Sequence, residues 1–291
     1  MNIKKYIHTN IEIIIFFLLV SICSYLILRP SWEAFFTEQD GINQLDAIIY
    51  INLEARNDRK DLLMKELEKL KTDMSKVHKV SGVYMPKNGH KGCIQSHILA
   101  LNMIKMNNWN RVLILEDDAE LNMTPEIVNS LINNSLEVLD KDYPEWNVIM
   151  LATANKVIDK DYNKINKLKN ELNNELKNEL NNELNKKELP IDLDIYTNED
   201  KTNSLKLEKL KQATTSSAYI VKKEYADNIL NLFNHCNNNM SPKNMSSKGY
   251  EHWALDQKWA ELQNHNMWFC IDKDPIKQRA IWSTIQSDAS T

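Results

Sequence analysis

Apolar residues recur along the chain in two patterns that alternate with each other. Short apolar runs predict strands at residues 46–53, 77–84, 111–115, 146–151, 214–221 and 267–271. Apolar residues three or four positions apart predict helices at residues 58–70, 92–106 and 125–139, and further helices from Glu224 and from about Glu251. Strands that alternate with helices are typical of an α/β fold. We therefore predict an α/β domain with a mostly parallel central sheet over residues 46–291.

This pattern breaks between Asn155 and Thr214. Residues 169–184 read KNELNNELKNELNNEL, with a leucine at every fourth position, and this spacing predicts a helix. A repeat of such short period is typical of low-complexity segments. We place a helical insertion at about residues 156–212, as a surface excursion, a partly disordered lobe or a helix that binds a partner.

An apolar segment lies near the N-terminus. Residues 11–28 are mostly apolar, with Glu12 as their only charged residue, and their length suits a transmembrane helix. A cleaved signal peptide is the alternative, but Arg29 and Pro30 follow the segment where a small-residue cleavage site would be needed. Lys4 and Lys5 precede it and favour a cytosolic N-terminus. We predict a single-pass type II membrane protein with a cytosolic tail (1–10), a signal anchor (11–28) and a stem (29–45). Its catalytic domain would lie in the lumen of the endoplasmic reticulum or Golgi, or in a cell envelope.

Composition narrows the classes of partner. Charged residues make up 26% of the chain and the net charge is −4, so no basic stripe for nucleic acid is present. Cysteines are few and none forms a CxxC pair, which gives no sign of a zinc motif. Cys236 and Cys270 could form a disulfide in an oxidising lumen.

The strand at residues 111–115 runs directly into three acids, Glu116, Asp117 and Asp118. Ligands of open α/β sheets gather at the carboxyl ends of parallel strands. Strand alternation places Glu116 and Asp118 on one side and Asp117 on the other. Such a pair of carboxylates suits a hard divalent cation. The alternative is a turn that begins a helix, where acids interact favourably with the helix dipole.

Three further segments carry candidate residues. KNGHKGCIQSH (87–97) places two glycines before a helix, where an anion such as a diphosphate can bind, although an ordinary polar loop would read the same way. INLEARNDR (51–59) follows the first strand, so Arg56 and Arg59 either reach a phosphate or remain solvated. Asp256 lies between Trp253 and Trp259, a setting that suits sugar binding and base catalysis as well as simple core packing.

In order along the chain, these pieces resemble glycosyltransferase family 25, the family of lipooligosaccharide and collagen β-galactosyltransferases. The resemblance rests on INLEARNDR, GCIQSH, VLILEDDAEL and TTSSAYIVKKEYADNIL, and more weakly on ALDQKW and PIKQ. It covers residues 46–288 without the region of the insertion.

The resemblance implies a GT-A-like nucleotide-binding sandwich and an inverting transfer of galactose or glucose from a UDP-sugar. The acceptor would be a hydroxyl of a glycan or a protein, for example hydroxylysine of a collagen-like chain. Glu116, Asp117 and Asp118 correspond to the family's Mn²⁺-binding acids, with Asp118 as the first choice for direct ligation. The implied donor-side residues are Asn52, Arg59, Gly92, Ser96 and His97, of which Gly92, Ser96 and His97 belong, with Cys93, to an element that shapes the active site. Asp256 is the candidate general base.

Two other functions would fit parts of the same pattern. A catalytically inactive glycosyltransferase-like membrane scaffold or lectin could retain the acids. A metal-dependent phosphoesterase could also use acids at a strand end, but we find none of the additional His or Asp motifs that it would need.

Overall fold

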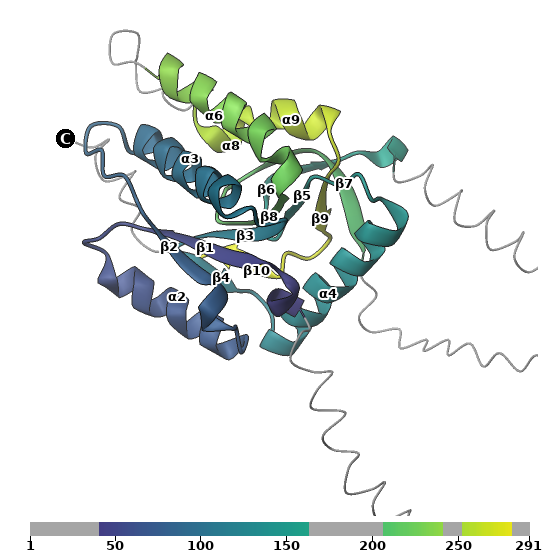
Figure 1. The fold of residues 1–291 in the computed structure, drawn as a ribbon. Coiled ribbons are helices and arrows are strands. Elements are labelled where there is room, and N and C mark those ends of the chain that lie inside the picture. Colours follow the sequence, from purple (N-terminus) through teal and green to yellow (C-terminus); the bar gives the residue numbers. More distant parts are fainter. Residues whose placement is uncertain (1–40, 163–205, 241–251, 281–291) are drawn as a thin grey trace, which may run out of the picture.

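The computed structural model describes residues 41–162, 206–240 and 252–280, in which strands and helices alternate (Figure 1). The strands are β1 (Ala47–Asn52), β2 (Val77–Ser81), β3 (Arg111–Glu116), β4 (Ala119–Leu121), β5 (Val148–Met150), β6 (Ala154–Ile158), β7 (Leu207–Thr214), β8 (Ala218–Lys222), β9 (Trp268–Ile271) and β10 (Ile276–Gln278). The helices are α2 (Asn57–Lys69), α3 (Gly89–Asn107), α4 (Pro125–Asp142), α6 (Ala226–Asn239), α8 (Leu255–Lys258) and α9 (Ala260–His265). Three short 3-10 turns accompany them: η1 (Gly41–Gln44), η2 (Met74–Lys76) and η3 (Lys223–Tyr225).

Eight of these strands form one sheet in the order β2-β1-β3-β8-β5-β9-β7-β6. Strand β1 is parallel to both β2 and β3, and β5 is parallel to β9. Strand β8 lies antiparallel between β3 and β5, so β1, β2, β3, β5 and β9 share one direction. The predicted α/β fold with a mostly parallel sheet is confirmed.

Helices cover both faces of the sheet (Figure 1): α3 and α6 lie on one face, and α2 and α4 on the other. Successive residues of β1 therefore enter different cores. Ile49 packs with Ile94 of α3 in the first core, whereas Ile48 packs with Leu63 of α2 and Ile132 of α4 in the second. Burial on both faces explains why the central strands appear in the sequence as continuous apolar runs.

Three boundaries differ from the sequence prediction. The strand expected at residues 214–221 is interrupted by a turn at Thr215, whose φ of 73° no regular strand can adopt. Helix α3 begins at Gly89 because the side chain of Asn88 accepts a hydrogen bond from the Lys91 amide. Ile42 and Leu45 are buried in the second core, so the folded domain includes the end of the segment predicted as a stem.

The sheet also continues into both ends of the predicted insertion. Strands β6 and β7 pair antiparallel, and the Asp159 amide donates to the Lys209 carbonyl at 2.9 Å. The NEL repeat itself lies within residues 163–205, outside the described ranges.

Two further expectations concern the membrane and the thiols. Within the described ranges, no helix has both the length and the apolar character needed to cross a bilayer. The predicted anchor at residues 11–28 lies outside these ranges. Cys93, Cys236 and Cys270 are free thiols, so the possible Cys236–Cys270 disulfide is not formed. Cys236 and Cys270 instead pack as small apolar side chains in the first core.

Candidate active site

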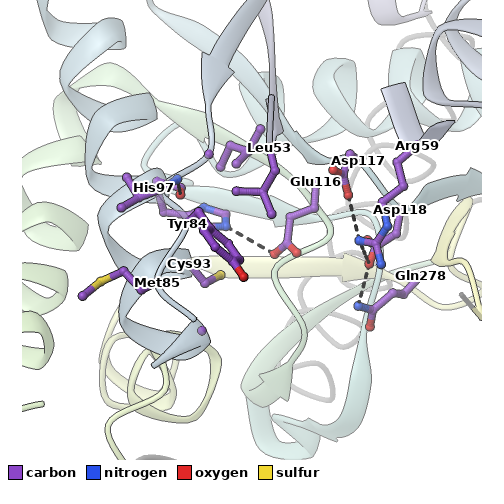
Figure 2. Close-up of a pocket in the computed structure, with 15 residues that line it drawn as sticks. Leu53, Arg59, Tyr84, Met85, Cys93, His97, Glu116, Asp117, Asp118 and Gln278 are labelled. Atoms are coloured by element: carbon purple, nitrogen blue, oxygen red, sulfur yellow. Dashed lines mark hydrogen bonds and ion pairs between the residues drawn. The ribbon is translucent and has the colours of Figure 1, made fainter. Parts of the chain in front are cut away.

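The three acids lie where the sequence pattern placed them, at the carboxyl end of β3 and beside the ends of β1 and β2. They line one cavity, together with residues of α3 and the segment after β2 (Figure 2). The cavity has a volume of about 110 Å³, whereas pockets that enclose a small-molecule ligand usually measure about 300–1,000 Å³. Within the described ranges, this cavity is therefore smaller than a typical ligand pocket.

Asp117 is held by a buried arginine. Arg59 Nη1 lies 3.0 Å from Asp117 Oδ1, and Asn52 Nδ2 donates to Asp117 Oδ2 at 2.9 Å. Burial raises the pKa of Asp117, and these two hydrogen bonds oppose the rise. Arg59 and Asn52, both predicted from the INLEARNDR segment, therefore reach the site through Asp117. Arg59 lines the cavity, whereas Asn52 is buried beside it.

Glu116 interacts with a different set of groups. His97 Nε2 lies 3.3 Å from Glu116 Oε1, and the hydroxyl of Ser216 donates to the same oxygen. Burial alone would raise the pKa of Glu116, but the contacts with His97 and Ser216 outweigh it and lower this pKa. The other ring nitrogen of His97, Nδ1, lies 3.0 Å from the hydroxyl of Tyr219.

Asp118 has the most incomplete set of partners among the three acids. Gln278 Nε2 donates to Asp118 Oδ2 at 3.1 Å, and Arg59 Nη1 lies 3.8 Å from the same oxygen. The other oxygen, Oδ1, is buried and accepts no hydrogen bond. Burial and the negative charge of Glu116 raise the pKa of Asp118 to about 7. A buried carboxylate oxygen without a hydrogen bond, beside two further acids, fits a divalent cation.

The grouping of the acids differs from the expected one. Strand alternation was expected to place Glu116 and Asp118 on one side and Asp117 on the other. Strand β3 ends at Glu116, so residues 117 and 118 lie in a turn to which alternation no longer applies. As a result Asp117 and Asp118 both contact Arg59, while Glu116 faces His97 (Figure 2).

Gly92 and Ser96 of α3 support the wall of the cavity. A Cβ atom at Gly92 would lie 2.4 Å from the Val83 carbonyl oxygen, so only glycine allows this close approach. The Ser96 hydroxyl accepts from the Val83 amide at 2.8 Å and donates to the Gly92 carbonyl at 2.7 Å. Both residues thus position the segment after β2, from which Tyr84 and Met85 line the cavity (Figure 2).

Asp256 lies in a neighbouring cavity and does not line the one with the acids. This second cavity has a volume of about 580 Å³, and His90, His252 and Lys258 line it together with Asp256. Burial raises the pKa of Asp256, and the negative charge of Glu116 raises it further. The two carboxylates therefore interact electrostatically. Trp259 is fully buried and packs against Tyr219 and Trp268, which gives it a role in the core.

The turn between β7 and β8 connects the two cavities. The Thr215 amide donates to Asp256 Oδ2 at 3.1 Å, and the Ser216 hydroxyl bonds Glu116. Thr215 Oγ1 lies 3.5 Å from Gln278 Oε1, and Gln278 bonds Asp118. Sequence reasoning assigned no role to Thr215, Ser216 or Gln278. In the sequence, these residues stand out only because they belong to the TTSS and PIKQ segments that resemble the family.

Comparison with known proteins identifies the family. The sequence model of glycosyltransferase family 25 (LPS biosynthesis protein) matches residues 76–245, which is more than half of the chain. The match includes Gly92, Ser96, His97 and the acids at 116–118. None of the curated proteins matches the chain.

Solved structures with a similar arrangement share little sequence with this chain. One is a glycosyltransferase involved in the glycosylation of the major capsid of PBCV-1 (10% identity, TM-score 0.37), with 84% of this chain and 96% of that chain covered. Another is the mannose-1-phosphate geranyltransferase from Thermus thermophilus (9% identity, TM-score 0.38), with 84% and 79% covered. These scores are low, so the family assignment rests on the sequence match: the chain belongs to glycosyltransferase family 25 and is a glycosyltransferase.

Proposed function

We propose that this glycosyltransferase is an inverting, metal-dependent hexosyltransferase with a GT-A-like catalytic domain. It moves galactose or glucose from a UDP-sugar to a hydroxyl group of a glycan or a protein, hydroxylysine of a collagen-like chain included. The observation that carries this proposal is the buried, unbonded Oδ1 of Asp118 in a cavity with two further acids.

Asp118 is the residue that we expect to hold the cation directly, with Glu116 and Asp117 adding negative charge. Mn²⁺ fits this oxygen-rich donor set. When bound, it would neutralise the charge that develops on the diphosphate leaving group. Arg59 is already paired with Asp117, so its guanidinium reduces the repulsion among the acids and supplies a positive charge close to the phosphates.

The acceptor hydroxyl needs a group that takes its proton as the new bond to the anomeric carbon forms. Asp256 suits this role because burial and the charge of Glu116 raise its pKa, which makes it a stronger base than an exposed aspartate. The hydrogen bond from the Thr215 amide fixes one of its oxygens. The cavity around Asp256 would then receive the acceptor, while the cavity at the acids receives the donor.

The N-terminal segment is proposed to be a membrane anchor. Residues 11–28 would anchor the protein in a membrane as a type II protein and leave the catalytic domain in a lumen or cell envelope. Alkaline extraction of membranes, followed by protease protection, tests the anchor and its orientation. Release of the intact chain into the soluble fraction would refute it.

The transfer reaction is tested by incubating the protein with Mn²⁺ and a panel of UDP-sugars, with and without glycan and peptide acceptors. We expect release of UDP from UDP-galactose or UDP-glucose, no release after chelation, and loss of release in Asp118→Ala. Cleavage of phosphoesters without sugar transfer would instead favour a phosphoesterase. Binding of sugars without either reaction would favour a scaffold or lectin.

A further inference from the structure

Three side chains with different donor atoms lie close together in the lining of the acid-lined cavity. The sulfur of Cys93, a ring nitrogen of His97 and a carboxylate oxygen of Glu116 lie within 4.8 Å of one another. Cys93 and His97 are four positions apart in α3, which places them on one face of that helix. Glu116 reaches them from the end of β3 (Figure 2).

We propose that Cys93, His97 and Glu116 form a second cation site, which takes a thiophilic divalent ion such as Zn²⁺. This site shares Glu116 with the all-oxygen site proposed at Asp118 but differs from it in its sulfur and nitrogen donors. It does not depend on the proposed transfer reaction. A thiolate, an imidazole and a carboxylate are ligands typical of zinc. Manganese binds most weakly of the first-row divalent metals to such donors.

The surroundings of His97 orient it as a ligand. The ring is fully buried, and the Tyr219 hydroxyl lies 3.0 Å from Nδ1. This contact leaves Nε2 facing Glu116 and Cys93. Metal-bound histidines almost always have their second ring nitrogen fixed by such an outer hydrogen bond.

Glu116 is fixed in a similar way. Its backbone amide donates to the Ser217 carbonyl at 2.9 Å, and its carboxylate accepts from the Ser216 hydroxyl. Ligand atoms around tetrahedral zinc lie about 3–4 Å apart. The three donors therefore have to close by only about 1 Å, which side-chain rotation can supply.

The simpler alternative is a His97–Glu116 contact beside an inert thiol. Without a cation the thiol does keep its proton, because burial and the charges of Glu116, Asp256 and Asp118 raise the pKa of Cys93 well above its usual value. On binding, the sulfur–metal bond replaces the S–H bond and the proton leaves to the solvent. The two charges of the cation then balance the thiolate and the Glu116 carboxylate.

All three residues line the cavity, so a fourth ligand position would open into it. Three protein ligands with one open position are typical of zinc that binds a water or a substrate atom. A cation at this position would occupy part of the cavity that we assign to the donor. Zn²⁺ is therefore expected to compete with donor binding.

Cobalt(II) tests the site directly, because a cobalt–thiolate bond gives a charge-transfer band in the near ultraviolet. We would titrate the metal-free, reduced full-length chain with Co²⁺ in a Cys23→Ser background, which removes the thiol of the N-terminal segment. We expect the band to appear at one equivalent, to disappear when Zn²⁺ is added, and to survive an excess of Mn²⁺. Absence of the band at saturating Co²⁺ would overturn the proposal.

Matched variants locate the thiolate. Cys93→Ser should abolish the band, whereas Cys236→Ser and Cys270→Ser, which change buried cysteines elsewhere, should retain it. Asp118→Asn should also retain it, and Tyr219→Phe should weaken Co²⁺ binding by about 10–100-fold. A band that survives Cys93→Ser, or one that vanishes in Asp118→Asn, would place the metal elsewhere and refute the site.

A measurement on the unmodified protein covers the case in which Cys93→Ser does not fold. Zn²⁺ should slow the alkylation of Cys93 by iodoacetamide, as read by mass spectrometry of its peptide. Alkylation of Cys236 and Cys270 in the same sample serves as the reference. Equal rates at Cys93 with and without Zn²⁺ would refute the proposal.

Discussion

Arg59 and Asp117 form a buried ion pair, with Nη1 of the arginine 3.0 Å from Oδ1 of the aspartate and about a tenth of each side chain exposed. This pair explains how three adjacent acids can follow an apolar strand. One of them carries its own counter-charge within the fold. Asp118 lies 3.8 Å from the same guanidinium, too far for a hydrogen bond. It is therefore the acid that most needs a cation.

Removing this arginine should strongly destabilise the protein. Arg59→Met leaves the buried Asp117 without its counter-charge, which typically costs about 3–5 kcal/mol in the free energy of unfolding. Arg56→Met is the matched control, because the Arg56–Asp58 pair at 2.8 Å is far more exposed and its loss should have a much smaller effect. Urea denaturation measures both. The double variant Arg59→Met/Asp117→Asn should recover part of the loss, and equal effects of the two arginine variants would contradict this account.

Asp118→Asn should stabilise the metal-free protein more at pH 8 than at pH 5. The pKa of Asp118 is about 7 in the folded protein, and an unfolded aspartate titrates near 4. Between these values the folded state binds the extra proton, so the free energy of unfolding falls as the pH rises. Asparagine has no proton to lose. The gain of the variant over the native protein should therefore be larger near pH 8 than near pH 5, by about 2–3 kcal/mol.

Denaturant titrations in the presence of a chelator, at both pH values, measure this difference. Mn²⁺ provides the converse control: it should raise the melting temperature of the native protein near pH 8 and leave Asp118→Asn unchanged. A difference between the two proteins that does not depend on pH would argue against the titration of Asp118.

Thr215→Gly tests whether the positive φ at Thr215 affects stability, transfer activity or both. A threonine with a φ of 73° is strained by about 1–3 kcal/mol, and glycine adopts this conformation without strain. Thr215→Gly should therefore be at least as stable as the native protein. It keeps the backbone amide that bonds Asp256, so sugar transfer should also persist. Lys71→Gly, at a second residue with positive φ (54°) and far from the acids in sequence, is the control for stability alone.

Transfer activity distinguishes two roles of Thr215. If Thr215→Gly lost activity while it gained stability, the contact between Thr215 Oγ1 and Gln278 would be the functional one, rather than the backbone amide. Circular dichroism melts and a UDP-release assay on the same samples give both readouts.

Asp256→Asn should lower kcat for transfer by about 10²–10⁴-fold and leave the KM for the donor unchanged. The base must be ionised, and burial raises the pKa of Asp256. The rate of the native enzyme at saturating Mn²⁺ should therefore fall as the pH drops through this raised pKa. The residual rate of the variant should lack this dependence. Near-normal transfer by Asp256→Asn would show that another group accepts the proton.

Gly92→Ala tests the wall of the acid-lined cavity. The new methyl group would lie 2.4 Å from the Val83 carbonyl oxygen, and overpacking of this kind costs about 1–3 kcal/mol. Alanine improves helix propensity by only about 1 kcal/mol, so the clash should prevail. Gly82→Ala is a milder comparison, since its methyl group would meet the Leu53 side chain at 3.1 Å and the backbone of Leu53 and Asn52 at 3.2 and 3.3 Å, all farther than the 2.4 Å at Gly92. Donor binding should weaken in Gly92→Ala more than in Gly82→Ala.

The sequence was informative wherever local pattern decides the structure. The apolar run before Glu116 predicted both the strand and the position of the acids at its carboxyl end. It did not predict which partner each acid contacts, because the pairing of Asp117 with Arg59 joins residues 58 positions apart. The contact of Gln278 with Asp118 spans 160 positions and depends on the pairing of β10 with β4. Such relationships arise only from the tertiary fold.

Asp256 and Thr215 show the same limit. The tryptophans beside Asp256 suggested a sugar site, yet Trp259 donates its Nε1 hydrogen to the Ala213 carbonyl and belongs to the core. The positive φ of Thr215 had no local signal, because threonine is a residue that favours strands. Here the surrounding contacts override local propensity.

The antiparallel pairing of β6 with β7 has a consequence for how the gene can change. The chain leaves and rejoins the domain on two adjacent strands at one edge of the sheet, and these strands bond to each other. The hydrogen bonds between β6 and β7 fix both ends of the segment between them. Copies of the four-residue NEL unit could accordingly be gained or lost by replication slippage while the sheet, both cores and the acid-lined cavity stay intact.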